Sequence, residues 1–267
     1  MNRLAVLPLL FLAGGPALLR ADAIYFDLFS GPLLQDWNNP GLISAHDDWS
    51  TVPSVIGYRG DGLASTGTSP FSILAAGTGS PVDVLANQTN TSSSTGGVAE
   101  FDRLADPTVA LQGSGTASAP FLLFHLSSLF VDEVHVSYQL RDLDGSADNA
   151  VQGVALQYRF GFTGEFLPVL DGFTSDATAG PSLSGLVTPV SVSLPPAAAG
   201  LPQLQLRFIT ADATGSDEWV GVDNIVITGR RHAPPAATVP EAFAGVWVAA
   251  PLLALLAAAR RRERITR

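Results

Sequence analysis

The stretch Ser-Asp-Glu-Trp-Val-Gly-Val-Asp-Asn-Ile-Val-Ile-Thr-Gly, residues 216–229, decides the fold predicted for this chain. An acidic turn leads into a run of β-branched residues, and Gly229 closes it. Because side chains alternate across a strand, Asp223, Ile225 and Ile227 are expected to share one face. Beyond this stretch the composition changes to alanine and proline. We therefore interpret it as the last strand of a β-sandwich.

Five earlier segments support the same fold. Apolar residues alternate with polar ones, or form a short apolar run, in residues 121–126, 133–141, 154–160, 190–194 and 203–208. An antiparallel sheet with one face in water needs one apolar and one polar face on each strand. Two such sheets bury their apolar faces against each other. The sequence therefore predicts an all-β fold, an antiparallel, jelly-roll-like β-sandwich over residues 24–229.

The N-terminus has the pattern of an export signal. Residues 1–23 combine Arg3, a long apolar stretch and the small-residue cleavage site Ala21-Asp22-Ala23. This combination predicts a helical signal peptide, and the alternative is a buried N-terminal helix. The mature protein is then expected outside the cytoplasm.

The C-terminus has the pattern of a membrane anchor. Residues 242–259 contain no charge and would extend about 27 Å as a helix, which predicts a transmembrane helix. Arg260, Arg261 and Arg262 follow as a membrane stop, so the basic tail 260–267 is expected in the cytoplasm. Residues 230–241 form a proline-containing linker. The alternative, an amphipathic surface helix, lacks a polar face.

Composition excludes several kinds of chemistry. The chain has no cysteine and no lysine, which excludes disulfides, thiol nucleophiles, Cys-ligated zinc and Schiff-base catalysis. Its four histidines have no metal-binding spacing, and no Gly-x-Ser-x-Gly elbow is present. Residues 24–241 contain seven arginines and 22 acidic residues, a net charge of −15. Such a body repels phosphate, so nucleic acid is not an expected partner.

The end of the chain resembles a known sorting signal. Val239, Pro240 and Glu241, the apolar span and the arginines behind it resemble the PEP-CTERM signal of exported proteins of Gram-negative bacteria. Ala242 stands where that signal usually has a second proline. The resemblance implies an exosortase-like sorting enzyme as a partner. It also implies anchoring in the inner membrane facing the periplasm, or a place at the cell surface or outside the cell after processing.

The body resembles a jelly-roll-like module of large secreted bacterial proteins, some of which carry an extracellular nuclease domain. The resemblance rests on the motifs Asp47-Asp48-Trp49-Ser50, Tyr58-Arg59-Gly60-Asp61-Gly62, Arg141-Asp142-Leu143-Asp144-Gly145-Ser146, Ala155-Leu156-Gln157-Tyr158-Arg159 and Asp217-Glu218-Trp219-Val220-Gly221-Val222-Asp223-Asn224-Ile225. It covers most of residues 24–229 and implies the fold and an accessory, non-catalytic role.

Two groups of carboxylates are candidate sites for structural calcium, an ion that takes six to eight oxygen ligands. Asp142, Asp144 and Asp148 lie around a glycine turn, and the alternative is a loop whose side chains bond their own backbone. Residues 24–29 are predicted as the first strand and contain Asp27, and Asp223 is in the predicted last strand; the first and last strands are often neighbours in such sandwiches. The alternative for Asp223 is an arginine or backbone-amide partner, or an outward position.

Aromatic side chains are candidates for binding sugars. Trp49, Tyr58 and Trp219, with Trp37, offer flat apolar surfaces of the kind that stack on sugar rings. The alternative for each is packing in the core. The nearby Gly57, Gly60 and Gly62 are available for unusual backbone angles.

These observations predict an envelope- or surface-anchored protein that is not an enzyme. We expect it to act in adhesion, in matrix organisation or in binding extracellular polysaccharide, with calcium as a structural ion. Two alternatives stay open: a hydrolase that acts on extracellular polysaccharide or nucleic acid, since carboxylate pairs can be formed by distant residues, and a structural protein without a ligand.

Overall fold

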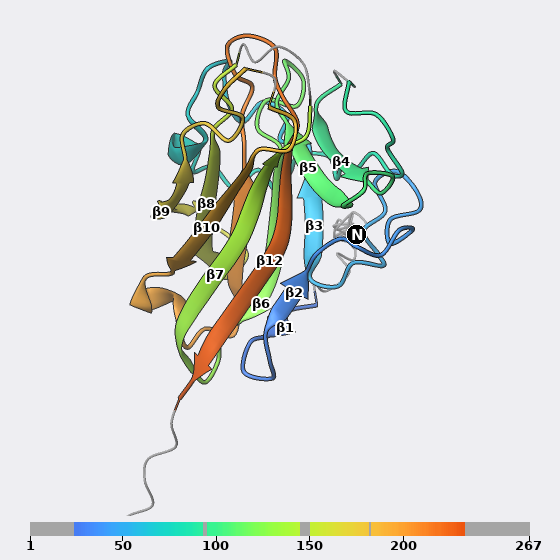
Figure 1. Cartoon of the computed structure of the whole chain (residues 1–267). Coiled ribbons are helices and arrows are strands. Elements are labelled where there is room, and N and C mark those ends of the chain that lie inside the picture. The colour runs from blue at the N-terminus through green and yellow to red at the C-terminus, as the bar shows by residue number, and fades with distance from the viewer. Residues whose placement is uncertain (1–23, 93–94, 145–149, 182, 233–267) are drawn as a thin grey trace, which may run out of the picture. The chain divides into compact units, whose positions relative to one another are not determined.

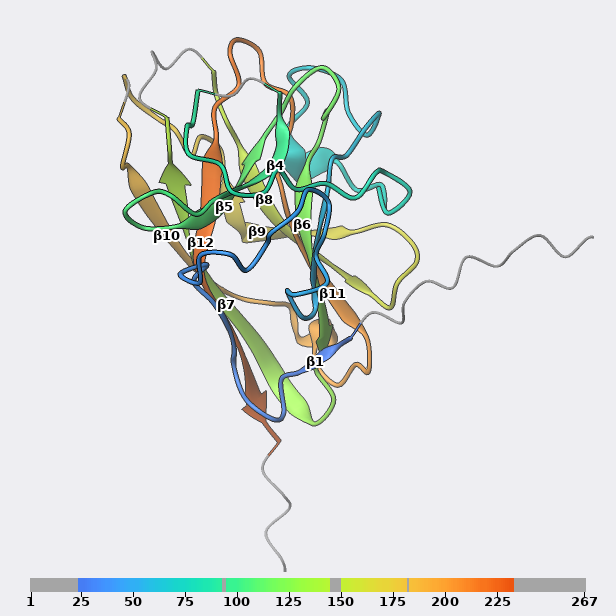
Figure 2. The same cartoon turned by 90° about the vertical axis from the view of Figure 1, so that its right-hand side faces the viewer.

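The computed structural model of the chain describes residues 24–92, 95–144, 150–181 and 183–232. The regular structure in this part of the chain is β, apart from two short 3₁₀ turns, η1 (Pro70–Ser72) and η2 (Pro196–Ala198). Two six-stranded sheets stack as the two layers of a sandwich (Figures 1 and 2). The predicted all-β sandwich is confirmed.

One layer, here called the β6 sheet, has the order β1-β6-β11-β8-β9, and β3 also pairs with β6. The parallel pair β1–β6 is an exception among otherwise antiparallel strand pairs. Its strands are β1 (Phe26–Asp27), β3 (Val55–Tyr58), β6 (Phe121–Ser127), β8 (Val154–Phe160), β9 (Leu167–Thr174) and β11 (Leu204–Ile209).

The other layer, the β7 sheet, has the order β10-β7-β12-β5-β4, and β2 also pairs with β12. All of its strand pairs are antiparallel. Its strands are β2 (Leu33–Gln35), β4 (Gly97–Phe101), β5 (Thr108–Gln112), β7 (Val131–Asp142), β10 (Val187–Ser193) and β12 (Val220–Arg231). The long neighbours β7 and β12 form the centre of this layer (Figure 1).

The core between the sheets consists of the apolar side of the alternating strands. Tyr138 of β7 packs edge-on against Phe208 of β11 with ring centroids 4.8 Å apart, and Phe124 of β6 meets the same ring at 5.4 Å. Burial of such side chains is the main stabilising contribution to the fold. The alternation in the sequence therefore identifies the inward residues of β7 and β11 correctly, and those of β8 apart from Phe160, which is exposed.

The polar side of the β6 sheet is also buried, contrary to the prediction that it faces water. Gln157, Arg159, Gln205 and Arg207 are each at most 1% exposed. They are bonded to one another across β8 and β11 and to carbonyl groups of the covering loops, for example Arg207 Nη1 to the Ala75 oxygen at 2.8 Å. The loops between β3 and β4 and between β8 and β9 thus cover this face.

A β-bulge in β12 corrects the predicted facing of the last strand. The register against β7 shifts between Asp223 and Val226, and Asn224 has a φ of 49°. The shift places Ile225 and Ile227 in the core together with Val222, so Asp223 is on the opposite face from the two isoleucines. A single extra residue in one strand has this effect because side chains alternate with a period of two.

Other predictions near the ends and loops have mixed outcomes. The strand β3 is not among the segments that the sequence predicts as strands. The predicted helices at 1–23 and 242–259, and the sorting motif, lie outside the described residues. In the part that the structure describes, no helix is long and apolar enough to cross a membrane.

Candidate functional site

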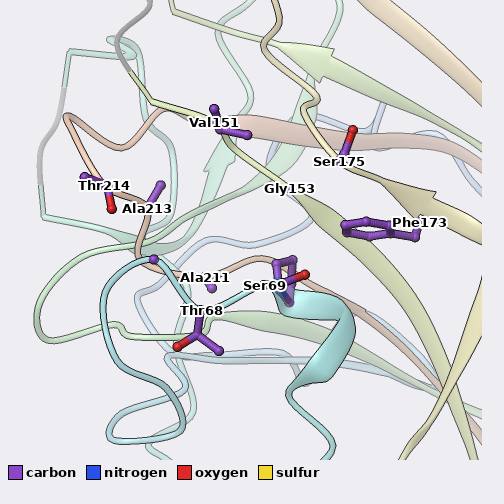
Figure 3. A pocket seen from close by; sticks show the side chains of 11 residues that line it. Thr68, Ser69, Val151, Gly153, Phe173, Ser175, Ala211, Ala213 and Thr214 are labelled. Atoms are coloured by element: carbon purple, nitrogen blue, oxygen red, sulfur yellow. The ribbon is translucent and has the colours of Figure 1, made fainter.

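A pocket of about 340 Å³ lies at one end of the sandwich. Four segments from distant parts of the sequence form it, and Figure 3 shows their side chains around an open space. Its lining residues are Gly67, Thr68, Ser69, Pro70, Val151, Gly153, Phe173, Ser175, Ala211, Ala213 and Thr214. The segment 211–214 begins one residue beyond the end of β11, and 151–153 directly precedes β8, the antiparallel partner of β11. The volume is in the lower range of small-molecule sites.

The lining combines hydroxyl groups with an aromatic ring and contains no ionisable side chain. Thr68, Ser69, Ser175 and Thr214 supply the hydroxyls (Figure 3). Phe173 of β9 supplies the ring. A lining of this kind can form hydrogen bonds and an apolar contact, but it cannot neutralise a charged ligand.

A second ring, that of Phe71, packs against the Phe173 ring. Phe71 of η1 lies with its ring centroid 5.2 Å from that of Phe173, at an interplanar angle of 48°. Both rings pack against the apolar cluster that covers the outer face of the β6 sheet. The wall formed by Phe173 is therefore anchored in the fold, because η1 closes over β8 and β9.

Two glycines of the lining lie close to atoms of the other segments. A Cβ atom on Gly153 would lie 3.2 Å from Pro70 Cγ and 3.3 Å from the Ser175 oxygen. Gly67 has a φ of 78°, and a Cβ there would lie 3.0 Å from Thr214 Oγ1. The Gly67 amide donates to the Asp212 carbonyl at 2.7 Å, which joins two of the four segments. Close backbone approach, which glycine permits, thus shapes the site.

Two carboxyl groups, those of Asp212 and Asp217, are bonded to residues in or next to the pocket lining. The Thr66 hydroxyl donates to Asp212, and the Ala213 amide donates to Asp217 Oδ1 at 2.7 Å. The pKa of Asp217 is raised to about 6, mainly by burial and also by the adjacent Asp212 carboxyl, while the hydrogen bond from the Ala213 amide opposes the rise. These carboxyl groups are not among the lining residues, so they shape the wall from outside the pocket.

The structure does not bring Asp27 and Asp223 together as a calcium site. Asp27 is in β1, which pairs with β6, whereas Asp223 is in β12 of the other sheet. Asp27 accepts hydrogen bonds within its own turn, from the Phe29 amide at 3.0 Å and the Ser30 hydroxyl at 2.6 Å. Arg141 Nη1 donates to Asp223 Oδ2 at 2.6 Å. The expectation that first and last strands are neighbours is wrong because β2 takes the place beside β12.

The second predicted calcium site is described only in part. Asp142 and Asp144 are both buried, at the end of β7 and just beyond it, while Asp148 lies outside the described residues. The Asp142 amide donates to the Leu186 carbonyl at 2.9 Å, and the Asp142 carbonyl accepts from the Gly185 amide at 3.0 Å. Within the described ranges, no three His, Cys, Asp or Glu side chains are grouped so that they could hold a metal ion. Calcium here stays a prediction.

The aromatic residues predicted to bind sugars are in the core, which was the stated alternative. Trp49, Tyr58 and Trp219 are all buried. Trp219 packs against Phe101, and Trp49 Nε1 donates to the Asp83 carbonyl at 3.2 Å. Trp37, likewise buried, donates from Nε1 to the Val222 carbonyl at 2.8 Å. None of these rings has a free face for a sugar.

Sequence reasoning missed the pocket, because its residues are small, common and far apart in the chain. The available signal was the cluster of small residues at 65–70, which reads as a turn, and the glycine directly before β8. Neither indicates that the two segments meet. Phe173 was missed because β9 itself was not predicted.

Several solved structures are similar to this chain at low sequence identity. No protein-family model and no curated protein matches the chain. A cyclase from Fischerella sp. TAU is similar over 76% of this chain and 100% of its own, with 12% identity and a TM-score of 0.41. The non-crystalline cellulose specific carbohydrate-binding module CBM28 is similar over 49% of this chain and 80% of its own, with 14% identity and a TM-score of 0.35. The K3 adhesin domain of Lys-gingipain from Porphyromonas gingivalis w83 is similar over 46% of this chain and 74% of its own, with 19% identity and a TM-score of 0.33. At these identities and scores, the likenesses carry no argument about function.

Proposed function

We propose that this protein is an exported, envelope- or surface-anchored β-sandwich that binds a neutral glycan in the pocket, without catalysing a reaction. The observation that carries the proposal is the lining of hydroxyl groups and one aromatic ring without any ionisable side chain. Adhesion to polysaccharide, or organisation of a polysaccharide matrix, is the role that such a site would serve.

The chemistry of a sugar ring is complementary to this lining. One face of the ring presents C–H groups that pack on an aromatic side chain, as Phe173 offers. Its edge presents hydroxyls that exchange hydrogen bonds with the side chains of Ser69, Ser175 and Thr214. Pockets that fix a ligand with a few polar groups on an otherwise apolar wall are the usual small-molecule sites. The pocket therefore suits one or two sugar units of a longer chain.

The charge of the protein argues for a neutral glycan over an acidic one. The net charge of −15 over residues 24–241 repels uronate, sulfate and phosphate groups. The pocket lining contains no arginine or histidine to offset that repulsion. We expect neutral oligosaccharides to bind and acidic ones to bind weakly or not at all.

A glycan array with the full chain in detergent tests the proposal. The best neutral ligand is then titrated into wild type, Phe173→Ala and Phe71→Ala. Phe173→Ala should weaken binding by roughly tenfold or more, a loss of about 1.4 kcal/mol, because the stacking surface is removed. Phe71→Ala is the matched control: it removes a ring of the same cluster that does not line the pocket. A smaller effect of Phe71→Ala separates a direct contact from a packing defect.

A second pair of variants tests the hydroxyl contacts. Thr214→Val keeps the shape of an exposed lining residue and removes its hydroxyl, whereas Thr163→Val does the same at an exposed position outside the pocket. Only the first should weaken binding. An array without any neutral ligand would refute the proposal, as would binding that neither pocket variant changes. Release of reducing ends from a bound glycan would favour the hydrolase alternative instead.

The sorting part of the proposal rests on the sequence of the tail. Val239, Pro240 and Glu241 with the apolar span behind them support processing by an exosortase-like enzyme. Fractionation of cells that carry a tagged body tests this. The tag should be found with the inner membrane or, after processing, at the surface or in the medium. A soluble cytoplasmic location would contradict it.

A further inference from the structure

The end of the sandwich away from the pocket carries an exposed aromatic pair. Phe29 and Phe130 are 40% and 67% exposed, with ring centroids 5.8 Å apart at 70°. Each ring extends from its own tight turn: the Ser30 amide bonds the Asp27 carbonyl at 3.1 Å, and the Val131 amide bonds the Ser128 carbonyl at 3.2 Å. Two neighbouring large apolar side chains at the tips of turns are uncommon on a surface that meets only water.

The backbone holds Phe130 in an unfavourable conformation while exposing it. Its φ is 60°, in the left-handed region that bulky residues rarely adopt. Such a conformation persists only where the surrounding structure enforces it, and it is concentrated at functional positions. Here the turn between β6 and β7 enforces it, and the ring is directed outward instead of into the core.

The last strand ends beside this aromatic pair. Arg231, the final residue of β12, is in register with Val131, the neighbour of Phe130. Its guanidinium lies 5.2 Å from the centroid of the Phe29 ring and its Nη2 donates to the Ser30 carbonyl at 3.4 Å. Figures 1 and 2 both show the end of β12, the β6–β7 turn and the β1–β2 loop at the same end of the sandwich.

The sequence beyond β12 predicts a membrane segment a short distance along the chain from this end. Ten residues, 232–241, separate it from the uncharged apolar segment 242–259 and the arginines that follow. Ten residues extend at most about 35 Å. If 242–259 crosses a membrane, as its sequence predicts, the lipid surface lies within that distance of the end of β12, which is next to the aromatic pair.

We propose that the surface formed by Phe29, Phe130 and Arg231 docks on the lipid surface of the membrane that anchors the chain. Phenyl rings enter the boundary between headgroups and acyl chains, and the arginine remains among the headgroup phosphates. Two rings give only weak binding to free vesicles, but a short tether raises the local concentration to the millimolar range. The sandwich then stands with its pocket directed away from the membrane. This inference goes beyond glycan binding and does not depend on it.

Site-specific labelling tests the proposal, since the chain has no native cysteine. The full chain carrying Ser30→Cys or Thr214→Cys is labelled with an environment-sensitive fluorophore and reconstituted into phosphatidylcholine vesicles. Ser30 is next to Phe29, and Thr214 is an exposed residue of the pocket. The label at 30 should be blue-shifted and quenched several-fold less by iodide than the label at 214. Equal quenching at both positions overturns the proposal, as does failure of the chain to float with vesicles.

Matched variants identify the cause of the protection. Phe29→Ser with Phe130→Ser should raise quenching at position 30 to the level at position 214, whereas Phe162→Ser, at another exposed phenylalanine, should leave it unchanged. Unchanged melting temperatures show that the variants fold. Protection that increases with the protein-to-lipid ratio would identify a second copy of the chain as the occupant and overturn the lipid proposal. Glycan binding by the double variant should equal that of wild type, so the two proposals fail independently.

Discussion

Arg141 of β7 and Asp223 of β12 form an ion pair of 2.6 Å on the outer face of the β7 sheet. The Asp223 side chain is fully buried, and the Arg141 side chain is 13% exposed. Burial raises the pKa of Asp223, and the Arg141 guanidinium and the Asn224 amide oppose that shift. Arg141 also meets Asp106 at 3.2 Å. Asp223, which the sequence predicts as a calcium ligand, is therefore paired with an arginine of the same chain.

Removing the arginine should destabilise the fold strongly. Arg141→Met leaves the Asp223 carboxylate buried without its partner, which costs about 3–5 kcal/mol. The free energy of unfolding in urea at pH 7 measures this. Arg230→Met is the matched control on the same sheet, because the Arg230–Glu133 pair is exposed and such pairs contribute at most about 1 kcal/mol. Equal losses in the two variants would contradict the importance of burial.

Asp217 should make stability fall as pH rises. Its pKa is raised from 3.8 to about 6 in the folded protein, mainly by burial. A raised pKa means that the folded state binds the proton more tightly, so this contribution is complete below pH 4 and is lost as pH rises through 6. A rise of this size in the pKa corresponds to at most about 3 kcal/mol, and solvent screening of the half-buried carboxyl reduces the effect to about 1–2 kcal/mol. Asp217→Asn, which is neutral at every pH, should match wild type near pH 4 and exceed it at pH 7. A constant difference between the two proteins across this range would refute the assignment.

Arg207 should not tolerate replacement by lysine. Its guanidinium donates to Gln157 Oε1 and to the carbonyls of Ile73 and Ala75, and it lies 3.9 Å from the Phe166 ring centroid. Burial lowers the pKa of Arg207 to about 9, so it remains charged at pH 7. An ammonium group lacks the planar fork and leaves buried acceptors unpaired, which costs about 2–4 kcal/mol. Chemical unfolding measures the loss. Arg103→Lys, at an exposed arginine, should change the free energy of unfolding by less than about 0.5 kcal/mol.

Calcium should stabilise the fold if it binds the acidic loop after β7, as the sequence predicts. Extracellular calcium modules bind in the range of about 0.1–1 mM, so 10 mM calcium should stabilise the fold by about 1.4–2.7 kcal/mol. The melting temperature in calcium, compared with that in chelator, measures this, and Asp144→Asn should abolish the difference. Asp27→Asn should not, because Asp27 lies in the other sheet. No shift in wild type at 10 mM would end the calcium hypothesis.

The strands that the sequence predicts well are those whose inward residues are set by alternation alone. β8 and β11 need apolar residues at every second position to fill the core. This requirement is the same whether water or loops of the protein lie on the other face. That covering is not predictable from the pattern: Arg159 and Arg207 read as solvent-exposed, yet loops from two other parts of the chain bury them. Long-range contacts of irregular segments leave no periodic signal in the sequence.

The site residues were harder to predict for the same reason. Trp49 and Trp219 are predicted to bind sugars because their rings are large and flat, but burial in the core also stabilises a large ring, and both are found there. The bulge at Asn224 changes the facing of Asp223 through one residue with a positive φ, which asparagine adopts more readily than most residues. The pocket combines serine, threonine and glycine from four segments. In the sequence such residues indicate only loops, and the strands that bring the four segments together are not visible in any one of them.

The glycines before the η1 loop offer a matched test of close backbone packing. Gly60 and Gly62 have φ values of 73° and 66°, so alanine is strained at both, by about 1–2 kcal/mol. A Cβ atom on Gly62 would meet no atom within 4 Å, whereas one on Gly60 would overlap the Ala119 carbonyl. To relieve that overlap, the 60–63 turn must shift away from the strand entry at residues 118–120. The shift would break the bonds that the Gly60 carbonyl accepts from the Ala119 amide at 3.2 Å and the Ser118 hydroxyl at 2.9 Å. Gly60→Ala should therefore lose at least about 2 kcal/mol more of unfolding free energy than Gly62→Ala. Losses of equal size would show that the backbone angle alone, and not the close approach to Ala119, requires glycine at position 60.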